Sequence, residues 1–252
     1  MPSKGSNMML GAKELIAAAG SNGSAESCDS QVSNFGWLDN LKLREYYPRG
    51  SVLFVEGQRP RGLFLLCQGK AKISISSAGG KTLILRIAQS GDLIGLNSVL
   101  TGRPYDATVS ALEDCQIDFV SRANFIRLLG NSKTACVNLS QNLARQLTEI
   151  IESVSSLLLS QSAAEKLAKL LLRWCDEIGE STPQGIRLNH GLTQEEIAQM
   201  ICASRETVTR LFAELKRRRI ITFADNSILV RDAKALEMYM CGNTPTTFSP
   251  LV

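Results

Sequence analysis

The sequence predicts an α+β chain: an antiparallel β-roll of the jelly-roll kind, then a long helix, then a helical domain that ends in a β-hairpin. Three observations support this prediction. Short β-type runs alternate with glycine-containing turns between residues 46 and 120. No glycine or proline interrupts the helical pattern of residues 133–159. After residue 190, two short helical segments lead into a strand–turn–strand pattern.

Residues 1–35 are rich in Gly, Ser and Ala, and we expect them to form a flexible N-terminal segment, with a short helix favoured at 12–19. Residues 36–41 are expected to begin a short helix that leads into the first domain, assigned to 36–130. A single Lys precedes Met8–Leu10, which is a poor signal peptide. No apolar run approaches the roughly 18 residues of a membrane span, so we expect a cytoplasmic chain without a membrane partner.

The first domain consists of β-type runs separated by glycines such as Gly57, Gly69 and Gly91. Strands repeated about every 8–12 residues with glycine turns are typical of an antiparallel sandwich or roll. A few helical residues, 122–129, follow the last strand. The predicted strands are 52–55, 63–67, 71–75, 82–87, 93–94, 107–111 and 115–120.

The long helical stretch, assigned to 131–160, carries apolar residues at alternating spacings of three and four from Cys136 onward. This spacing indicates a coiled-coil-like seam of about three heptads. A helix packed only on its own roll is the alternative, but the length of the seam favours a symmetric dimer. The predicted dimerisation residues are Leu139, Leu143, Leu147, Ile150, Val154 and Leu157.

The C-terminal domain, assigned to 161–236, has three helix-start signals. Ser162–Glu165 and Thr193–Glu196 both fit the capping-box pattern, and Ser204 is a good N-cap. Two short helices joined by a turn of three or four residues are typical of a helix-turn-helix. The strand–turn–strand pattern at 220–230 adds a wing. Residues 237–252 are expected to form a flexible tail.

The helix after Ser204 carries side chains suited to reading DNA bases on one face, about 140° wide. Arg can donate two hydrogen bonds to guanine, and Glu can accept one from cytosine. The basic run 216–219 that follows is suited to phosphate contact. An ordinary solvated Arg/Glu face is the alternative, but the capping box, turn and wing occur in the order of a DNA-binding domain. The residues of this face are Arg205, Glu206, Thr209 and Arg210.

Composition excludes several other functions. The net charge of +4 is mild, and the seven cysteines are dispersed without a CxxC pair. We expect reduced thiols packed mostly in the core, Cys67 and Cys115 among them. His190 is the only histidine, which excludes a His-pair metal site, and we expect it to lie in a surface loop. No catalytic constellation is recognisable, so we predict neither an enzyme nor a metal centre.

The pattern resembles the CRP/FNR superfamily of bacterial transcription regulators from about Tyr46 to Lys234. The roll motifs 50–57, 69–72 and 91–95 carry the resemblance, together with 192–197 and 204–210. It implies a homodimer in the bacterial cytoplasm that binds double-stranded DNA at a palindrome with TGTGA-like half-sites. It also implies RNA polymerase as a partner and the role of an activator, although the residues themselves do not distinguish activation from repression.

The resemblance further implies a role for each DNA-binding residue. Arg205 and Arg210 would read guanines and Glu206 a cytosine. Thr193 and Gln194 would hold the phosphate backbone. Ser204 and Thr209 complete the predicted DNA-binding set.

The resemblance places the candidate effector pocket at Gly95, Leu96, Tyr105 and Asp106. The cyclic-AMP branch has Gly-Glu and then Arg-Ser-Ala, where this chain has Gly95-Leu96 and Tyr105-Asp106-Ala107. The Thr-Ser pair that meets adenine in that branch corresponds to Ile150-Ile151. The arginine that neutralises the cyclic phosphate is therefore missing, and we do not expect cyclic AMP to be sensed.

Two other cofactors are also not expected. Only Cys28 stands where the oxygen-sensing branch has clustered cysteines, and Asp118 replaces its cysteine in the roll. His190 lies outside the sensor domain, which argues against haem. Control by another small molecule, by thiol oxidation or by abundance remains open. The alternative function is a cyclic-nucleotide-binding module that acts through a protein partner, but the missing arginine and the winged helix argue against it.

Overall fold

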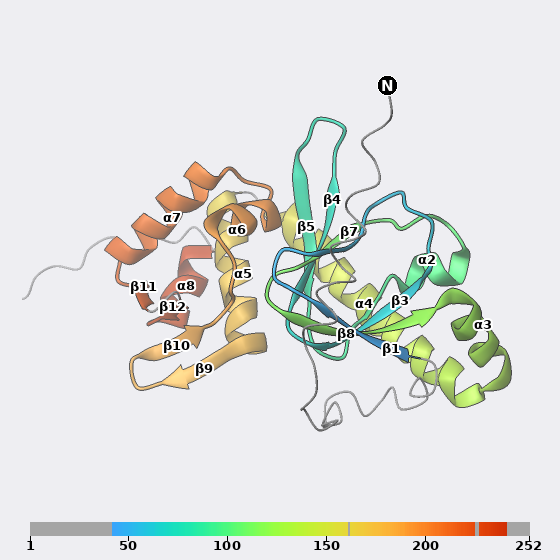
Figure 1. Cartoon of the computed structure of the whole chain (residues 1–252). Helices are drawn as coiled ribbons and strands as arrows, with labels where there is room; N and C mark the ends of the chain where they lie inside the picture. The colour runs from blue at the N-terminus through green and yellow to red at the C-terminus, as the bar shows by residue number, and fades with distance from the viewer. Residues whose placement is uncertain (1–41, 161, 225–226, 241–252) are drawn as a thin grey trace, which may run out of the picture.

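The computed structural model describes residues 42–160, 162–224 and 227–240. The segments expected at 1–35 and 36–41 and the tail from 241 onward lie outside the described residues. Figure 1 shows the β-roll on one side, the C-terminal domain on the other, and the long helix α4 running along the roll. This arrangement confirms the α+β prediction.

Two four-stranded antiparallel sheets form the roll, in the orders β1-β8-β3-β6 and β2-β7-β4-β5. The strands predicted from sequence are confirmed, and two elements were missed. The edge strand β1 pairs with β8 from Lys42↔Val120 to Tyr47↔Cys115, but its charged sequence hides it. The short helix α2 (Leu96–Thr101) lies between Gly95 and Gly102, both in the left-handed conformation. The strands of the roll are β1 (Lys42–Tyr47), β2 (Val52–Phe54), β3 (Gly62–Gln68), β4 (Ala71–Ser76), β5 (Thr82–Ala88), β6 (Leu93–Ile94), β7 (Thr108–Ala111) and β8 (Cys115–Ser121).

Strand β3 explains how the roll is filled, because its residues 63–67 are all buried. Successive side chains of a strand point to opposite faces. Leu63 and Leu65 join a cluster with Phe125 of α3 (Arg122–Asn131), whereas Phe64 and Leu66 pack between the two sheets. A strand covered on both faces has a continuous apolar run rather than an alternating one.

Helix α4 (Lys133–Leu159) confirms the predicted long helix and is about 40 Å long at 1.5 Å per residue. Its N-cap Ser132 accepts a hydrogen bond from the Ala135 N–H. The prediction that Leu139 belongs to the dimer seam is wrong, because Leu139 is buried in the cluster of Leu63 and Phe125 inside its own roll.

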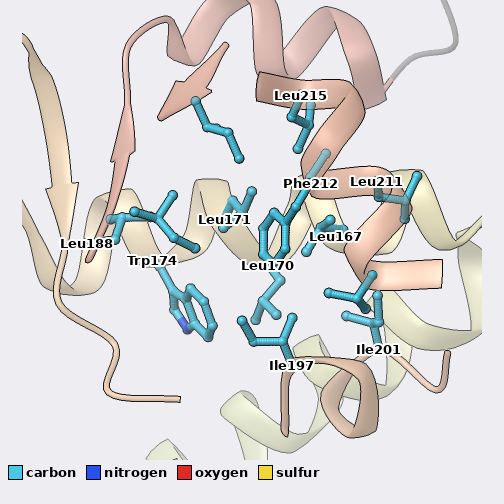
Figure 2. Close-up of a cluster of buried hydrophobic side chains, with 14 of the residues drawn as sticks. Leu167, Leu170, Leu171, Trp174, Leu188, Ile197, Ile201, Leu211, Phe212 and Leu215 are labelled. Atoms are coloured by element: carbon cyan, nitrogen blue, oxygen red, sulfur yellow. The ribbon is translucent and has the colours of Figure 1, made fainter. Parts of the chain in front are cut away.

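In the C-terminal domain, helices pack on a four-stranded sheet of order β11-β12-β10-β9. Figure 2 shows its core, in which Leu167 and Leu171 of α5 meet Phe212 and Leu215 of α7. The buried cluster continues into the roll through Ile84 of β5, so the two domains share apolar contacts. The elements are α5 (Ala163–Ile178), β9 (Gly179–Thr182), β10 (Gly185–Leu188), α6 (Gln194–Met200), α7 (Arg205–Arg217), β11 (Ile221–Ala224), β12 (Ser227–Val230) and α8 (Ala233–Met240).

Two boundaries differ from the sequence prediction. The hairpin β9–β10 occupies part of the segment read as a loop before the helix-turn-helix, and it extends the wing sheet. The predicted tail begins at 237, but α8 continues to Met240 because Tyr239 is buried beneath the Arg218 guanidinium, 5.2 Å from its ring centre.

The cysteines divide by environment. Cys67 and Cys115 are buried as predicted, whereas Cys136 and Cys202 are exposed, so the expectation of mostly buried thiols is wrong for these two. Burial raises the pKa of the half-buried Cys175 thiol to about 11, which keeps it protonated near neutral pH. Within the described residues, no helix combines the length and hydropathy of a membrane span.

Candidate DNA interface and interdomain cavity

The first helix of the helix-turn-helix starts at a reciprocal cap. Thr193 Oγ1 accepts a hydrogen bond from the Glu196 N–H at 3.2 Å, and Glu196 Oε2 accepts one from the Thr193 N–H at 3.0 Å. This confirms the capping box read from the sequence. Two of the free N–H groups at the start of α6 are thereby satisfied.

The connection to the second helix is short and strained at one residue. Cys202 has a φ of 54°, in the left-handed region, which is uncommon for a residue other than glycine. The Ala203 N–H returns to the Ala198 carbonyl at 3.0 Å. Ser204 then caps α7 by accepting from the Thr207 N–H at 3.2 Å, as its position in the sequence predicts.

The four side chains predicted to read bases lie together on the exposed side of α7. Arg205, Glu206, Thr209 and Arg210 are all exposed, whereas Val208, Leu211, Phe212 and Leu215 are buried on the opposite side. In Figure 1, α7 lies at the outer side of the C-terminal domain, away from the roll. The helix is thus held by its apolar face and presents its polar face to solvent.

A hydrogen bond joins the two helices within this surface. The Thr209 hydroxyl lies 2.6 Å from Gln194 Oε1 and 3.0 Å from the Arg205 carbonyl oxygen, and its single proton is donated to one of these acceptors or shared between them. With its hydroxyl engaged by the protein, Thr209 has a methyl group left to present outward. Gln194 and Thr209 therefore act as a pair that fixes the spacing of α6 and α7.

The basic run after α7 is not uniform. Lys216, Arg217 and Arg219 are exposed, but Arg218 turns back and pairs with Glu214 at 2.6 Å. Three of the four charges therefore remain on the surface beside the face that is predicted to read bases. Salt-dependent phosphate binding depends on such exposed charges.

Helix α4 presents an apolar stripe to solvent. Leu147, Ile150 and Val154 are each 45–58% exposed, and Leu143 is 36% exposed. Leu157 is half-buried near α5, and Leu139 faces the roll. Exposed apolar residues that recur every three or four positions on a helix are typical of a helix–helix interface.

The pocket predicted at Gly95, Leu96, Tyr105 and Asp106 is filled by the chain itself. Leu96 and Tyr105 are buried, and the Tyr105 ring stacks on Phe54 with centroids 3.8 Å apart. A Cβ placed on Gly95 would lie 2.9 Å from the Tyr105 ring. Asp106 points to the surface and accepts from Asn97 Nδ2 at 2.8 Å. The Tyr105 ring thus lies in the space beside Gly95, and an effector site at these four residues stays a prediction.

A larger cavity, of about 680 Å³, lies between the roll, α4 and the C-terminal domain. Asp92 is the centre of its charged wall, with Arg86 at 2.6 Å and Arg145 at 2.8 Å. Burial acts to raise the pKa of Asp92, but the two guanidinium groups outweigh it and hold that pKa below its usual value. The buried carboxylate thus stays ionised and ties the roll to α4.

His190 lines this cavity and is only 8% exposed, so the prediction of a surface-loop histidine is wrong. Its ring stacks on Trp174 of α5, with centroids 5.1 Å apart, and Nδ1 accepts from the Leu192 N–H at 2.9 Å. Burial and the neighbouring Lys70 lower its pKa to about 4. The tryptophan that covers it lies 16 positions earlier in the chain and gave no local signal.

Polar contacts also connect the roll to the helix-turn-helix. Lys72 Nζ of β4 pairs with Glu196 Oε1 of α6 at 2.8 Å, and Lys70 Nζ donates to the Asn189 carbonyl at 3.1 Å. The carboxylate that caps α6 therefore also binds the β-roll. A chain with a β-roll, a long connecting helix and a winged helix-turn-helix belongs to the class of DNA-binding transcription regulators.

Comparison with known proteins specifies the family. Residues 44–132 match the cyclic nucleotide-binding domain family, and residues 165–239 match the Crp-like helix-turn-helix domain family. The chain belongs to the CRP/FNR superfamily. The matched proteins are transcription regulators rather than enzymes.

Three proteins illustrate the similarity. The CRP-like cAMP-activated global transcriptional regulator of Mycobacterium tuberculosis is 28% identical over 190 residues, which cover 75% of this chain and 84% of the relative. The anaerobic regulatory protein of Bacillus subtilis is 25% identical over 212 residues, covering 82% and 88%. A CooA mutant from Carboxydothermus hydrogenoformans shares the fold, with a TM-score of 0.70 and 22% identity over 84% of this chain and 96% of that one.

Proposed function

We propose that the chain is a dimeric, sequence-specific transcription regulator that reads a palindrome with TGTGA-like half-sites. The observation that carries this proposal is the exposed set Arg205, Glu206 and Arg210 on the capped helix α7. Two Arg side chains can each pair with guanine O6 and N7, and a Glu between them can accept from cytosine N4. A carboxylate on this face would weaken unspecific phosphate binding, so its presence favours base reading.

The helix-turn-helix geometry supports backbone contacts beside the bases. Thr193 and Gln194 start α6, and the Gln194 side-chain amide can donate a hydrogen bond to a phosphate. Lys216, Arg217 and Arg219 add exposed positive charge. These residues would fix the register of the protein on DNA, and the α7 face would supply specificity.

The second copy in this proposal binds along α4. The exposed stripe of Leu143, Leu147, Ile150 and Val154 would be covered by the same stripe of a partner chain, as a two-fold axis requires. A dimer presents two recognition helices about one DNA turn, roughly 34 Å, apart, which matches a palindromic site. RNA polymerase is the partner expected of an activator in this superfamily.

We propose an effector other than cyclic AMP, although several relatives are described as cAMP-activated. Leu96 is apolar where a ribose acceptor is needed, and Tyr105 stands where a phosphate-binding Arg is needed. The Tyr105 ring also fills the space between Gly95 and Phe54. Neither haem nor an iron–sulfur cluster is part of the proposal.

Footprinting on a duplex that carries the TGTGA palindrome tests the function. We expect protection centred on both half-sites and none on a scrambled duplex of equal length, at several salt concentrations. Equal protection of the two duplexes would reduce the protein to an unspecific DNA binder. Tight binding of cyclic AMP, cyclic GMP or cyclic di-GMP without DNA binding would favour a regulatory module that acts through a protein partner.

A further inference from the structure

We propose that the cavity between the roll, α4 and the C-terminal domain binds a small organic anion, a molecule with a carboxylate or phosphate group on an apolar body. A ligand bound in this cavity would regulate DNA binding, so the regulatory part of the inference rests on the function proposed above. Its volume of about 680 Å³ lies in the range of small-molecule pockets. Its walls come from both domains, with Ile87 on β5, Arg145 on α4 and Trp174 on α5.

His190 supplies a hydrogen-bond donor whose direction is fixed. The Leu192 N–H donates to Nδ1, so that nitrogen carries no proton. With a pKa of about 4 the imidazole is neutral near pH 7, and its remaining proton is on Nε2. Trp174 holds the ring in place by stacking. His190 lines the cavity, and Nε2–H is therefore the group that it offers an occupant.

Lys70 and Arg173 add positive charge to the same cavity. Lys70 Nζ donates to the carbonyl of Asn189, a neutral acceptor, and no carboxylate of the described part of the chain forms an ion pair with it. Arg173 Nη1 donates to Ser153 Oγ at 3.2 Å, and its Nε is a buried atom without a hydrogen-bond partner among the described residues. The guanidinium of Arg173 lines the cavity beside Glu177, and its charge can still act on an anionic occupant.

The wall carries four acidic residues, Asp92, Glu149, Glu152 and Glu177, against four basic ones, so the preference for an anion depends on how these charges are paired and not on their sum. Asp92 and Glu149 are engaged by Arg86 and Arg145, which neutralise them in place. Glu177 lies 3.7 Å from Arg173 Nε, and burial is the main reason that its pKa is raised. Arg173 in turn offsets the negative charge of Glu177.

The rest of the lining indicates that the ligand has an apolar part. Ile87, Ile178, Leu192 and Met200 line the cavity together with Trp174. These side chains favour an organic body over a bare inorganic ion. An occupant that contacts His190 or Leu192 would also touch the segment that leads into Thr193, the N-cap of α6, and would thereby couple to DNA binding.

The test uses three probes that share one ring and differ in charge: benzoate, benzylamine and benzyl alcohol. His190 is the only histidine of the chain, so the imidazole signals of the full-length ¹⁵N-labelled protein report on this site alone. We expect benzoate to shift the Nε2–H signal in a saturable way, with smaller shifts from the other two. Stronger binding of benzylamine, which Glu152 and Glu177 would favour, overturns the assignment. So does the absence of a shift with all three probes.

Two matched variants localise the effect. Lys70→Met removes the charge but keeps the length of the side chain, and we expect it to weaken benzoate binding about tenfold. Lys81→Met makes the same change in the exposed turn between β4 and β5 and should leave the affinity unchanged. Equal effects of both variants would mean that general charge, and not this cavity, attracts the probe.

The same titration in the presence of DNA separates this inference from the proposed function. The affinity for the palindrome, measured with and without benzoate, should change by the same factor as the affinity for benzoate measured with and without DNA. A His190 shift without any DNA binding would sustain the anion site and refute the DNA-binding proposal. A His190 shift with unchanged DNA affinity would overturn the regulatory role of the site.

Discussion

Lys72 and Glu196 form an ion pair, 2.8 Å from Nζ to Oε1, that connects strand β4 of the roll to the first helix of the helix-turn-helix. The other oxygen of the same carboxylate caps α6 by accepting from the Thr193 N–H. Burial acts to raise the pKa of Glu196, but the Lys72 ammonium and the Thr193 groups outweigh it and lower that pKa. One side chain therefore caps the first helix of the helix-turn-helix and holds it to the β-roll.

Removing this pair should loosen the contact between the domains. We expect Lys72→Met to lower the free energy of unfolding by about 1 kcal/mol, because the pair is only partly buried. Glu196→Gln should cost about the same or more, since the carboxylate also caps α6. Denaturant unfolding of both variants measures this, with Lys81→Met as control. A loss for Lys81→Met as large as that for Lys72→Met would show that the ion pair contributes nothing specific.

Substitutions on the two faces of α4 should affect different properties: the exposed stripe should control dimerisation, and the buried face should control folding stability. Leu147→Glu places a charge on the exposed stripe and should convert the dimer to a monomer, because an unpaired charge cannot be buried between two helices. Leu139→Ala removes a side chain from the core of the roll and should cost about 2–5 kcal/mol of stability without dissociating the dimer.

Analytical ultracentrifugation and thermal unfolding distinguish the two variants. If Leu147→Glu sediments with the same mass as the parent protein, the stripe is not the dimer interface. If the Leu139→Ala protein is folded but monomeric, Leu139 belongs to the dimer interface after all.

His190 predicts a loss of stability in acid. Its pKa is about 4 in the folded chain, against 6.5 for the free side chain. As the pH falls through this window, the unfolded chain binds a proton that the native chain does not, so stability is lost between about pH 6.5 and pH 4. The full effect is up to about 3 kcal/mol.

A His190→Asn variant isolates this contribution. The Asn oxygen can accept from the Leu192 N–H but does not titrate, so the difference in stability between parent and variant should change over the same pH window. Denaturant unfolding at a series of pH values measures it. A difference that is constant with pH would mean that the imidazole titrates normally.

Base reading and phosphate binding should respond to different substitutions. Arg205→Ala should cost roughly 1–3 kcal/mol per half-site and relax specificity at one base pair. Lys216→Ala should weaken binding to all sequences alike and reduce the salt slope by about one unit. Titrations with matched and mismatched duplexes at several salt concentrations measure both. Identical profiles for the two variants would place Arg205 on phosphate instead of a base.

Local signals in the sequence were sufficient to predict the two helices of the helix-turn-helix. The caps at Thr193 and Ser204 join residues that are three positions apart, so a short stretch of sequence contains both partners of each hydrogen bond. The same holds for α4, whose helical periodicity is continuous. The strand β1 was missed because its place is set by pairing with β8, 68–78 residues further along the chain.

The cavity depends on contacts that no local pattern contains. His190 is buried because Trp174 of α5 covers it, and Leu139 faces inward because α3 and β3 lie beside it. Tyr105 fills the pocket that its position in the sequence assigned to a ligand, since its ring stacks on Phe54 from another strand. These environments are tertiary, and sequence periodicity does not encode them.

Selection of binding sites from a random-sequence duplex library tests the central claim most directly. The library contains no sequence chosen in advance, so the recovered motif reflects only the bases that the protein itself selects. We predict enrichment of an inverted repeat of TGTGA and TCACA with half-sites about one DNA turn apart. Recovery of an unrelated motif, a single half-site or no motif at all would contradict the account.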